Sequence, residues 1–193
     1  SDSLCKPFDK DRSGLNLGEG AGILIIERED ICRKRGGKKE LCIVGYGLAA
    51  DAYHLTAPRP DGSGLEAALV RAMEEARITP EQVAFVNAHG TATRDNDKVE
   101  GAVLARVFGP VIQFLSTKGF TGHTLGAAGG IEAVFTALGL REGWIPPSAG
   151  FENEDEEIGI VPISRRTSVS GQYAVSTSLA FGGNNSAIVI AKG

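Results

Sequence analysis

The sequence has few cysteines and no long run of apolar residues. Only three of its 193 residues are cysteine, Cys5, Cys32 and Cys42, and no two of them have CxxC spacing. An odd number of scattered cysteines argues against a disulfide framework or a zinc site and is typical of a reducing cytosol. No apolar run approaches the roughly 18 residues of a membrane-spanning helix, and the polar first residues do not resemble a signal peptide. We therefore expect a cytoplasmic protein with no metal site and no membrane contact.

A strong net charge is also absent. Twenty Lys and Arg residues against 24 Asp and Glu residues give a formal charge of −4, so whole-chain electrostatics give no reason to expect a nucleic acid partner. A hydrophobic content of 42% is typical of a globular protein, and this length is sufficient for a sizeable core. Glycine, by contrast, is abundant, with 26 residues concentrated in a few turns.

Apolar, β-branched stretches alternate with stretches of helical periodicity along the chain. The expected strands cover residues 21–27, 41–47, 83–86, 111–115, 174–178 and 187–191. The expected helices cover residues 63–76, 97–108 and 125–140. This alternation predicts an α/β fold with helices on both faces of a sheet. Such sheets bind ligands beyond the carboxyl ends of their strands.

Two of the expected strands lead into segments that contain histidine. His89 follows the strand at 83–86, and Lys118 and His123 follow the next strand. We expect His123 in the first turn of the following helix, where the positive end of the helix dipole disfavours a protonated imidazole. A neutral histidine can donate a hydrogen bond to a carbonyl oxygen that gains negative charge.

Three glycines lie inside that expected helix, Gly126, Gly129 and Gly130. Each costs about 1 kcal/mol relative to alanine within a helix, which indicates that another segment packs closely against it. A simpler interpretation of the stretch is a helix with a capping-turn histidine and a surface lysine. The stretch by itself does not separate the two interpretations.

Five stretches in collinear order resemble the β-ketoacyl-[acyl carrier protein] synthases, most closely the synthase II branch of the thiolase-like condensing enzymes. They are CKPFDKDRSGLNLGEGAGILIIE, AADAYHLTAP, NAHGTATRDNDKVE, STKGFTGHTLGAAGGIEA and STSLAFGGNNSAIVI. The resemblance implies the C-terminal half of a thiolase-like fold, a mixed five-stranded sheet with helices on both faces. Residues 1–35 would then be the tail end of the N-terminal half, a loop plus its last strand, and residues 36–193 the C-terminal domain.

The resemblance also implies a decarboxylative Claisen condensation, an acyltransferase reaction of fatty acid or polyketide biosynthesis. An acyl chain is held on an active-site cysteine, malonyl-carrier protein loses CO2, and the resulting carbanion attacks the acyl thioester. His89 and His123 match the two family histidines that stabilise the developing enolate, and Lys118 matches the lysine that supports the second one. Glu100 matches a carboxylate that pairs near that lysine, with a solvated helix face as the alternative.

No bound organic cofactor is implied, because phosphopantetheine arrives on the acyl carrier protein. Thr91 and Thr93 match threonines that hydrogen-bond the pantetheine arm. Arg12, with Lys10, matches a basic spot where the family meets the acidic carrier protein. Solvated surface charges are the alternative interpretation of these two residues.

The resemblance further implies two mobile loops that face each other. Phe181 matches a gating aromatic whose backbone N–H belongs to the acyl oxyanion hole, and Gly182 gives its loop the freedom to swing. Asp51, His54 and Thr56 match the second loop. Taken alone, His54 would more often be a polar residue with satisfied hydrogen bonds.

The family's nucleophile motif, a cysteine at the start of a buried helix, is not found in this sequence. Cys5, Cys32 and Cys42 lack a context that would activate a thiol, so we interpret all three as structural. The chain would then be the C-terminal part of a longer, homodimeric synthase and would be inactive alone. Asn16, Ala92 and the pair Leu179-Ala180 differ from the commonest fatty-acid enzymes and leave open a specialised ketosynthase.

A non-catalytic partner subunit is the alternative. Chain-length-factor-like proteins form heterodimers with a ketosynthase, typically lack the nucleophile and often lack one histidine. Because His89, His123 and Lys118 are all present, the sequence favours the enzyme.

Overall fold

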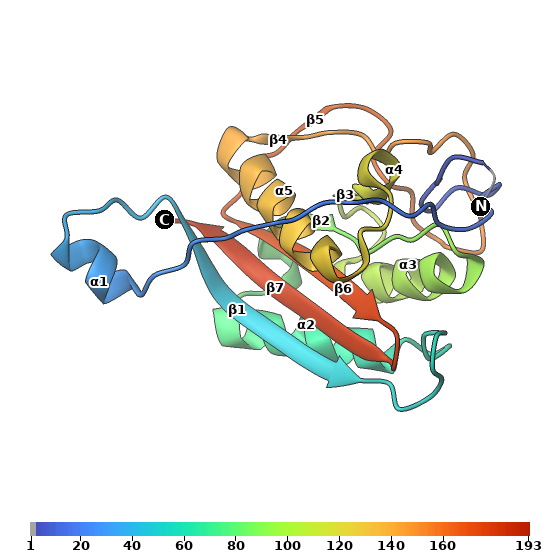
Figure 1. The fold of residues 1–193 in the computed structure, drawn as a ribbon, viewed down its shortest axis with the longest axis horizontal. Coiled ribbons are helices and arrows are strands. Elements are labelled where there is room, and N and C mark those ends of the chain that lie inside the picture. Colours follow the sequence, from blue (N-terminus) through green and yellow to red (C-terminus); the bar gives the residue numbers. More distant parts are fainter. Residues whose placement is uncertain (1–2) are drawn as a thin grey trace.

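A five-stranded mixed sheet forms the centre of the molecule (Figure 1), in the strand order β1-β7-β6-β2-β3. The structure, a computed structural model, describes residues 3–193. The sheet comprises β1 (Leu41–Ala50), β2 (Val83–Asn87), β3 (Phe114–Leu115), β6 (Tyr173–Ala180) and β7 (Asn184–Lys192). β2 runs parallel to β3 and β6, whereas β7 runs antiparallel to β1 and β6. The predicted mixed five-stranded sheet is confirmed.

Helices cover both faces of this sheet, as predicted. α2 (Ser63–Ala76) and α3 (Arg94–Phe108) pack on one face, and α5 (Ala128–Glu142) packs on the other (Figure 1). The remaining elements are short: α1 (Glu29–Lys34), η1 (Pro80–Gln82), α4 (Lys118–Thr121), η2 (Leu125–Ala127), β4 (Trp144–Ile145) and β5 (Thr167–Ser168). No helix within residues 3–193 is long and apolar enough to cross a membrane.

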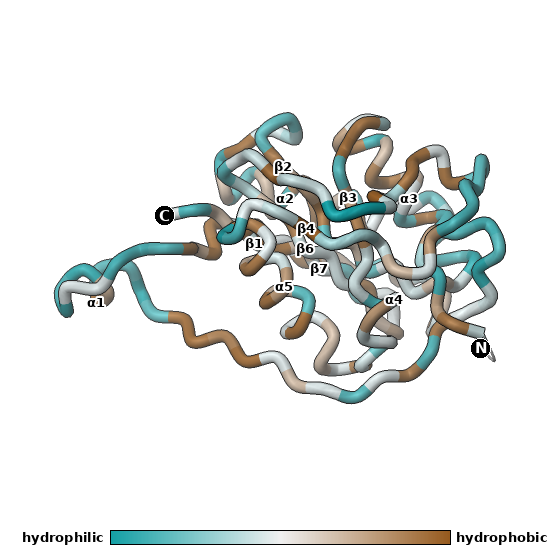
Figure 2. Tube along the Cα trace, turned by 90° about the horizontal axis from the view of Figure 1, so that it is seen from above, coloured by the Kyte–Doolittle hydropathy of each residue, from teal (hydrophilic) through white to brown (hydrophobic). Residues whose placement is uncertain are grey.

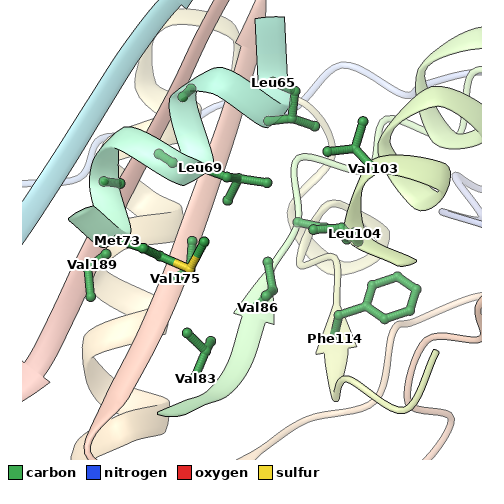
Figure 3. Close-up of a cluster of buried hydrophobic side chains, with 14 of the residues drawn as sticks. Leu65, Leu69, Met73, Val83, Val86, Val103, Leu104, Phe114, Val175 and Val189 are labelled. Carbon is green, nitrogen blue, oxygen red and sulfur yellow. The ribbon is translucent and has the colours of Figure 1, made fainter. Parts of the chain in front are cut away.

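Alternating strand residues divide the core into two layers. Figure 3 shows the layer beneath α2, where Leu69 and Met73 lie against Val86 and Val175. The neighbouring residues on the same strands point the opposite way and pack against α5. These are Phe85, Ala174 and Ile190, which share a cluster with Leu140.

Two glycines allow α2 to lie directly on β1. A Cβ atom on Gly45 would lie 2.1 Å from the carbonyl oxygen of Ala72, and one on Gly47 would lie 1.9 Å from that of Ala68. No real Cβ approaches backbone this closely, so the two backbones are in contact at these positions.

The strand predicted for residues 21–27 is not formed. Its isoleucines favour extended backbone, but Ile23 and Ile25 are 82% and 98% exposed, and none of the strands in residues 3–193 pairs with this segment. A β-strand requires a neighbour for its N–H and C=O groups. Figure 2 shows the segment as a hydrophobic stretch that runs apart from the sheet toward α1.

The predicted close contact with the glycine-containing helix is confirmed at two of the three glycines. A Cβ atom on Gly129 would lie 3.2 Å from Oγ of Ser178, and Gly130 lies against Gly22. A Cβ atom on Gly22 would lie 2.4 Å from the carbonyl carbon of Gly130, so the extended segment touches the first turn of α5. Nothing lies within 4 Å of the corresponding atom on Gly126.

Several predicted bounds differ from those observed. β6 and β7 extend beyond the strands predicted at residues 174–178 and 187–191, and only a short turn joins them. β3 has two residues rather than five, and α5 begins at Ala128 because residues 125–127 form a 3-10 turn.

Replacement of Gly47 by alanine should strongly destabilise the fold. The added methyl group forces α2 away from β1, and overpacking of this kind costs about 1–3 kcal/mol or more. The free energy of unfolding in urea measures the effect. Gly126→Ala is the matched control, since its methyl group meets nothing within 4 Å, and we expect its stability to stay within about 0.5 kcal/mol of the parent. Equal stability of the two variants would contradict the close contact.

Candidate active site

The two predicted histidines meet beyond the carboxyl ends of β2 and β3. Asn87, the last residue of β2, pairs with Leu115 of β3, and His89 follows two residues later. His123 comes from the turn after α4. The two imidazole rings lie with their centroids 5.2 Å apart and their planes at 85°.

Lys118 is buried beside these rings, with a relative exposure of 1%. Its ammonium group donates to the carbonyl oxygen of His89 at 2.6 Å, to Nδ1 of His89 at 3.1 Å and to Oε1 of Glu132. An ammonium group has three N–H donors, so all three have acceptors. Because Nδ1 of His89 accepts a hydrogen bond, its neutral ring carries the proton on Nε2.

His123 is fixed in the same tautomer by a different donor. The backbone N–H of Leu125 donates to Nδ1 of His123 at 3.2 Å, which leaves Nε2–H as the free donor of this ring. Both histidines therefore present the same nitrogen for a hydrogen bond to a ligand.

Both rings are held in the neutral form. Burial and then the charge of Lys118 lower the pKa of His123 to about 4. The same two causes, with a smaller contribution from His123, lower the pKa of His89 well below its usual range. The predicted cause was different and is wrong. His123 lies before η2, bridged to Leu17, and not in the first turn of a helix, so the helix dipole does not explain its neutrality.

The partner of Lys118 is Glu132, not Glu100. Glu132 lies on α5, it is buried, and burial raises its pKa to about 7 against the opposing effect of Lys118. Sequence reasoning missed this residue, although a single carboxylate among the small and apolar residues AGGIEAVFTALGL was a usable signal.

Glu100 orients the His89 turn instead. Its two carboxylate oxygens accept from the backbone N–H groups of His89 and Gly90, each at 2.8 Å, and from the hydroxyl of Thr177 at 2.7 Å. The side chain is fully buried, so the solvated-face alternative is also wrong. No local pattern predicts these contacts of Glu100, because they join it to two other segments, the turn at residues 89–90 and Thr177.

The two predicted threonines lie together next to this turn. The hydroxyl oxygens of Thr91 and Thr93 are 2.9 Å apart. Between them, Ala92 has a φ of +62°, and its N–H donates to Asp97 at 3.2 Å. Asp97 also accepts from the N–H of Phe8 at 2.7 Å, and burial raises its pKa to about 7. Asp97 therefore holds the threonine turn against the N-terminal segment.

The two predicted loops face each other. The N–H of Asp51 donates to the carbonyl of Gly183 at 2.8 Å, and the N–H of Gly182 donates to the carbonyl of Leu55 at 2.7 Å. The Asp51 carboxylate also accepts from the side chain of Asn185 at 2.8 Å. Gly182 and Gly183 have φ values of +81° and +74°, which explains why glycine occupies both positions.

The other residues of these loops are on the surface. Phe181 is 70% exposed, at the carboxyl end of β6. His54 and Thr56 are also exposed, and Nδ1 of His54 accepts from the backbone N–H of Thr56 at 3.1 Å. The structure therefore brings the two loops together, but it shows no hydrogen bond between Phe181 and the two histidines of the site.

The two residues predicted for a carrier-protein contact differ in their exposure. Lys10 is exposed. The side chain of Arg12 is 2% exposed and is paired with Asp155 at 2.5 Å and with Asp97 at 3.9 Å. Both earlier interpretations of Arg12 required an exposed guanidinium group, so both are wrong: its charge is used within the fold.

The arrangement offers hydrogen-bond donors and buried charge but no metal centre. Within residues 3–193, no group of three or more His, Cys, Asp or Glu side chains could hold a metal ion. Two neutral imidazoles with free Nε2–H groups beside a buried ammonium are suited to stabilising an oxyanion.

Comparison with known proteins gives consistent matches. The family model described as Beta-ketoacyl synthase, C-terminal domain, matches residues 41–152. The 3-oxoacyl-[acyl-carrier-protein] synthase 2 of Vibrio cholerae serotype O1 is 41% identical over 190 residues, which are 95% of this chain and 46% of that protein. The chain thus spans about half the length of the curated relatives it matches.

Solved structures give the same result. The ishigamide ketosynthase/chain length factor has a TM-score of 0.93 and 34% identity, over 100% of this chain and 48% of that one. A type II polyketide ketosynthase, AntDE, in complex with its acyl-carrier protein AntF has a TM-score of 0.93 and 30% identity, over 98% of this chain and 48% of that one.

Replacement of Lys118 by methionine should destabilise the protein by about 3 kcal/mol or more, because removal of one partner leaves the other buried without its counter-charge. The double variant Lys118→Met/Glu132→Gln should recover part of this loss. Denaturant unfolding at pH 8 measures both. Lys98→Met is the control: its pair with Glu157 is exposed, and its loss should cost at most about 1 kcal/mol. A Lys118 variant as stable as the control would show that the buried pair does not hold the site together.

Proposed function

Since the chain belongs to the β-ketoacyl synthase family, we propose that it is the C-terminal domain of a synthase that condenses malonyl-[acyl carrier protein] with an acyl thioester. One observation carries the proposal. The ring centroids of two neutral histidines, His89 and His123, lie 5.2 Å apart. Nδ1 of each ring accepts a hydrogen bond, so Nε2–H is the available donor.

Decarboxylation is the step that this pair would assist. The bond between the carboxylate and the α-carbon of the malonyl group breaks, CO2 leaves, and the electron pair forms an enolate on the thioester oxygen. Hydrogen bonds from Nε2–H of His89 and of His123 stabilise the charge on that oxygen more than on the neutral carbonyl. The α-carbon then attacks the acyl thioester carbonyl, and the thiolate departs.

Lys118 serves this step through the histidines. Its hydrogen bond to Nδ1 of His89 fixes the tautomer. Burial is the main cause that lowers the pKa of both rings, and the positive charge of Lys118 lowers it further. Glu132 compensates that charge within the protein. In this proposal Glu100 is a positioning residue, since it holds the backbone of the His89 turn.

The other predicted residues surround the substrate in this proposal. Thr91 and Thr93 would hydrogen-bond the pantetheine arm, and Phe181 with Gly182 would gate the site against the loop that contains Asp51 and Thr56. The hydrogen bonds between the two loops support this part. Lys10 is exposed and stays a candidate for the carrier-protein contact.

The acyl-accepting cysteine is proposed to lie outside this sequence. Cys5 is buried and burial raises the pKa of its thiol, which is the opposite of activation. Residues 1–35 would be the tail end of the half that supplies the cysteine, and residues 36–193 the domain that supplies the histidines. The chain alone would then be inactive, and the full protein would be a cytoplasmic homodimer.

A non-catalytic partner subunit is the second candidate, because one similar structure is a ketosynthase together with its chain length factor. A subunit that only shapes a product tunnel has no need of two histidines in matched tautomers beside a buried lysine. The geometry therefore favours the catalytic role.

The test uses the protein encoded by the complete reading frame. His89→Ala and His123→Ala should each lower malonyl-thioester decarboxylation about 10²- to 10³-fold, while transfer of the acyl group to the enzyme persists. Release of labelled CO2 and acyl-enzyme formation measure the two steps separately. The control is Glu157→Gln, on the surface.

Two results would overturn the proposal. Undiminished decarboxylation in the double histidine variant would remove the role of the pair. A parent protein that neither takes up an acyl group nor decarboxylates malonyl thioester would establish the partner-subunit candidate.

A further inference from the structure

Residues 14–18 lie between the two turns that carry the histidines. The N–H of Gly14 donates to the carbonyl of Ala92 at 3.0 Å, in the turn after His89. Further along, the carbonyl of Asn16 accepts the N–H of His123 at 2.7 Å, and the N–H of Gly18 donates to the carbonyl of His123 at 3.1 Å. The backbone of His123 is therefore bonded to this segment on both sides.

The contact between the segment and the His123 turn is too close for either to shift alone. A Cβ atom on Gly18 would lie 2.0 Å from the carbonyl oxygen of Thr121, and one on Gly122 would lie 3.0 Å from the N atom of Gly18. The position of residues 16–18 therefore determines the position of His123.

The side chain of Asn16, in the middle of this segment, bonds it to residues 3–5. Its Oδ1 accepts the N–H of Cys5 at 2.6 Å, and its Nδ2 donates to the carbonyl of Ser3 at 3.0 Å. Cys5 in turn donates from Sγ to the carbonyl of Thr91 at 3.7 Å. A continuous set of contacts thus runs from Thr91, two residues after His89, through Cys5 and Asn16 to His123.

We propose that Asn16 is a positioning residue that sets the spacing of the His89 and His123 rings. Its amide is suited to the task because one group must both accept from Cys5 and donate to Ser3, which an aliphatic or carboxylate side chain cannot do. Two rings that donate to a single oxygen require a fixed separation. The relevance of this spacing to catalysis rests on the proposed function, whereas the positioning itself does not.

The experiment compares the histidine NMR signals of the parent chain with those of Asn16→Leu, which has a similar shape but no hydrogen-bonding groups. The chain contains only three histidines, so the ring nitrogen and carbon signals are few. His54 is an internal reference, because it lies on a separate loop with its Nδ1 bonded to residues 56 and 57. Ser13→Ala is the matched control: it removes the 2.7 Å hydroxyl contact with Ser3 and leaves the Asn16 side-chain bonds to Cys5 and Ser3 in place.

In Asn16→Leu, the signals of His89 and His123 should shift, the cross-peaks between their rings should weaken, and His54 should be unchanged. The pKa of His123 should rise from about 4 by at least about 0.5, because a loosened turn admits water and reduces desolvation. Ser13→Ala should match the parent in all three histidines. If Asn16→Leu does not fold, Asn16→Ser is evaluated by the same criteria.

Either of two results would overturn the proposal. Unchanged His89 and His123 signals would show that Asn16 does not position the rings. Equal shifts in all three histidines would show a general structural role. Neither result depends on substrate, so the proposal and the condensation reaction fail separately.

Discussion

A single buried ammonium group joins the parts of this fold that carry its chemistry. Lys118 begins α4 just after β3 and is buried, with 1% exposure. Its ammonium group donates hydrogen bonds to the turn after β2 and to Glu132 of α5. A charge removed from water is tolerated only when all its donors have partners and a counter-charge is close. Lys118 meets this condition because β2 lies beside β3 and because α5 brings Glu132 to the turn after β2. The order of the strands and the position of the histidines therefore depend on the same contact.

The positive charge of Lys118 has the same effect on both histidines and on a bound anion. Burial is the main cause that keeps both histidines neutral, and the field of Lys118 adds to it because it disfavours imidazolium. The same field favours negative charge on a bound oxygen. Glu132 does not cancel this effect fully, because burial raises the pKa of its carboxyl group to about 7. The site thus limits its total charge at neutral pH, and its polarity comes mainly from oriented donors.

Local pattern was sufficient for some of this structure and not for the rest. Helical spacing located α2, apolar runs located β2 and β6, and the histidines after successive parallel strands were expected at one sheet edge, where they are found. The errors concern contacts between distant residues. Residues 21–27 have strand-forming side chains, but no strand in the described part of the chain, residues 3–193, pairs with them. Lys118 pairs with an acid on α5 and not on α3, and Arg12 is buried because Asp97 and Asp155 converge on it. The spacing of residues along the chain does not predict these contacts.

The two halves of the candidate site differ in how firmly they are held, and the difference suits their proposed tasks. The histidine turns are bound by buried groups: Lys118, the Glu100 carboxylate with its backbone donors, and the N-terminal segment fixed by Arg12 and Asn16. The facing loops at residues 51–56 and 181–183 are joined by a few hydrogen bonds and expose Phe181, His54 and Thr56. Few buried contacts mean a low free energy of local opening. In the proposed function, the hydrogen-bond donors to a charged oxygen lie on the firmly held histidine turns. The substrate would enter past the loops at residues 51–56 and 181–183, which open more easily.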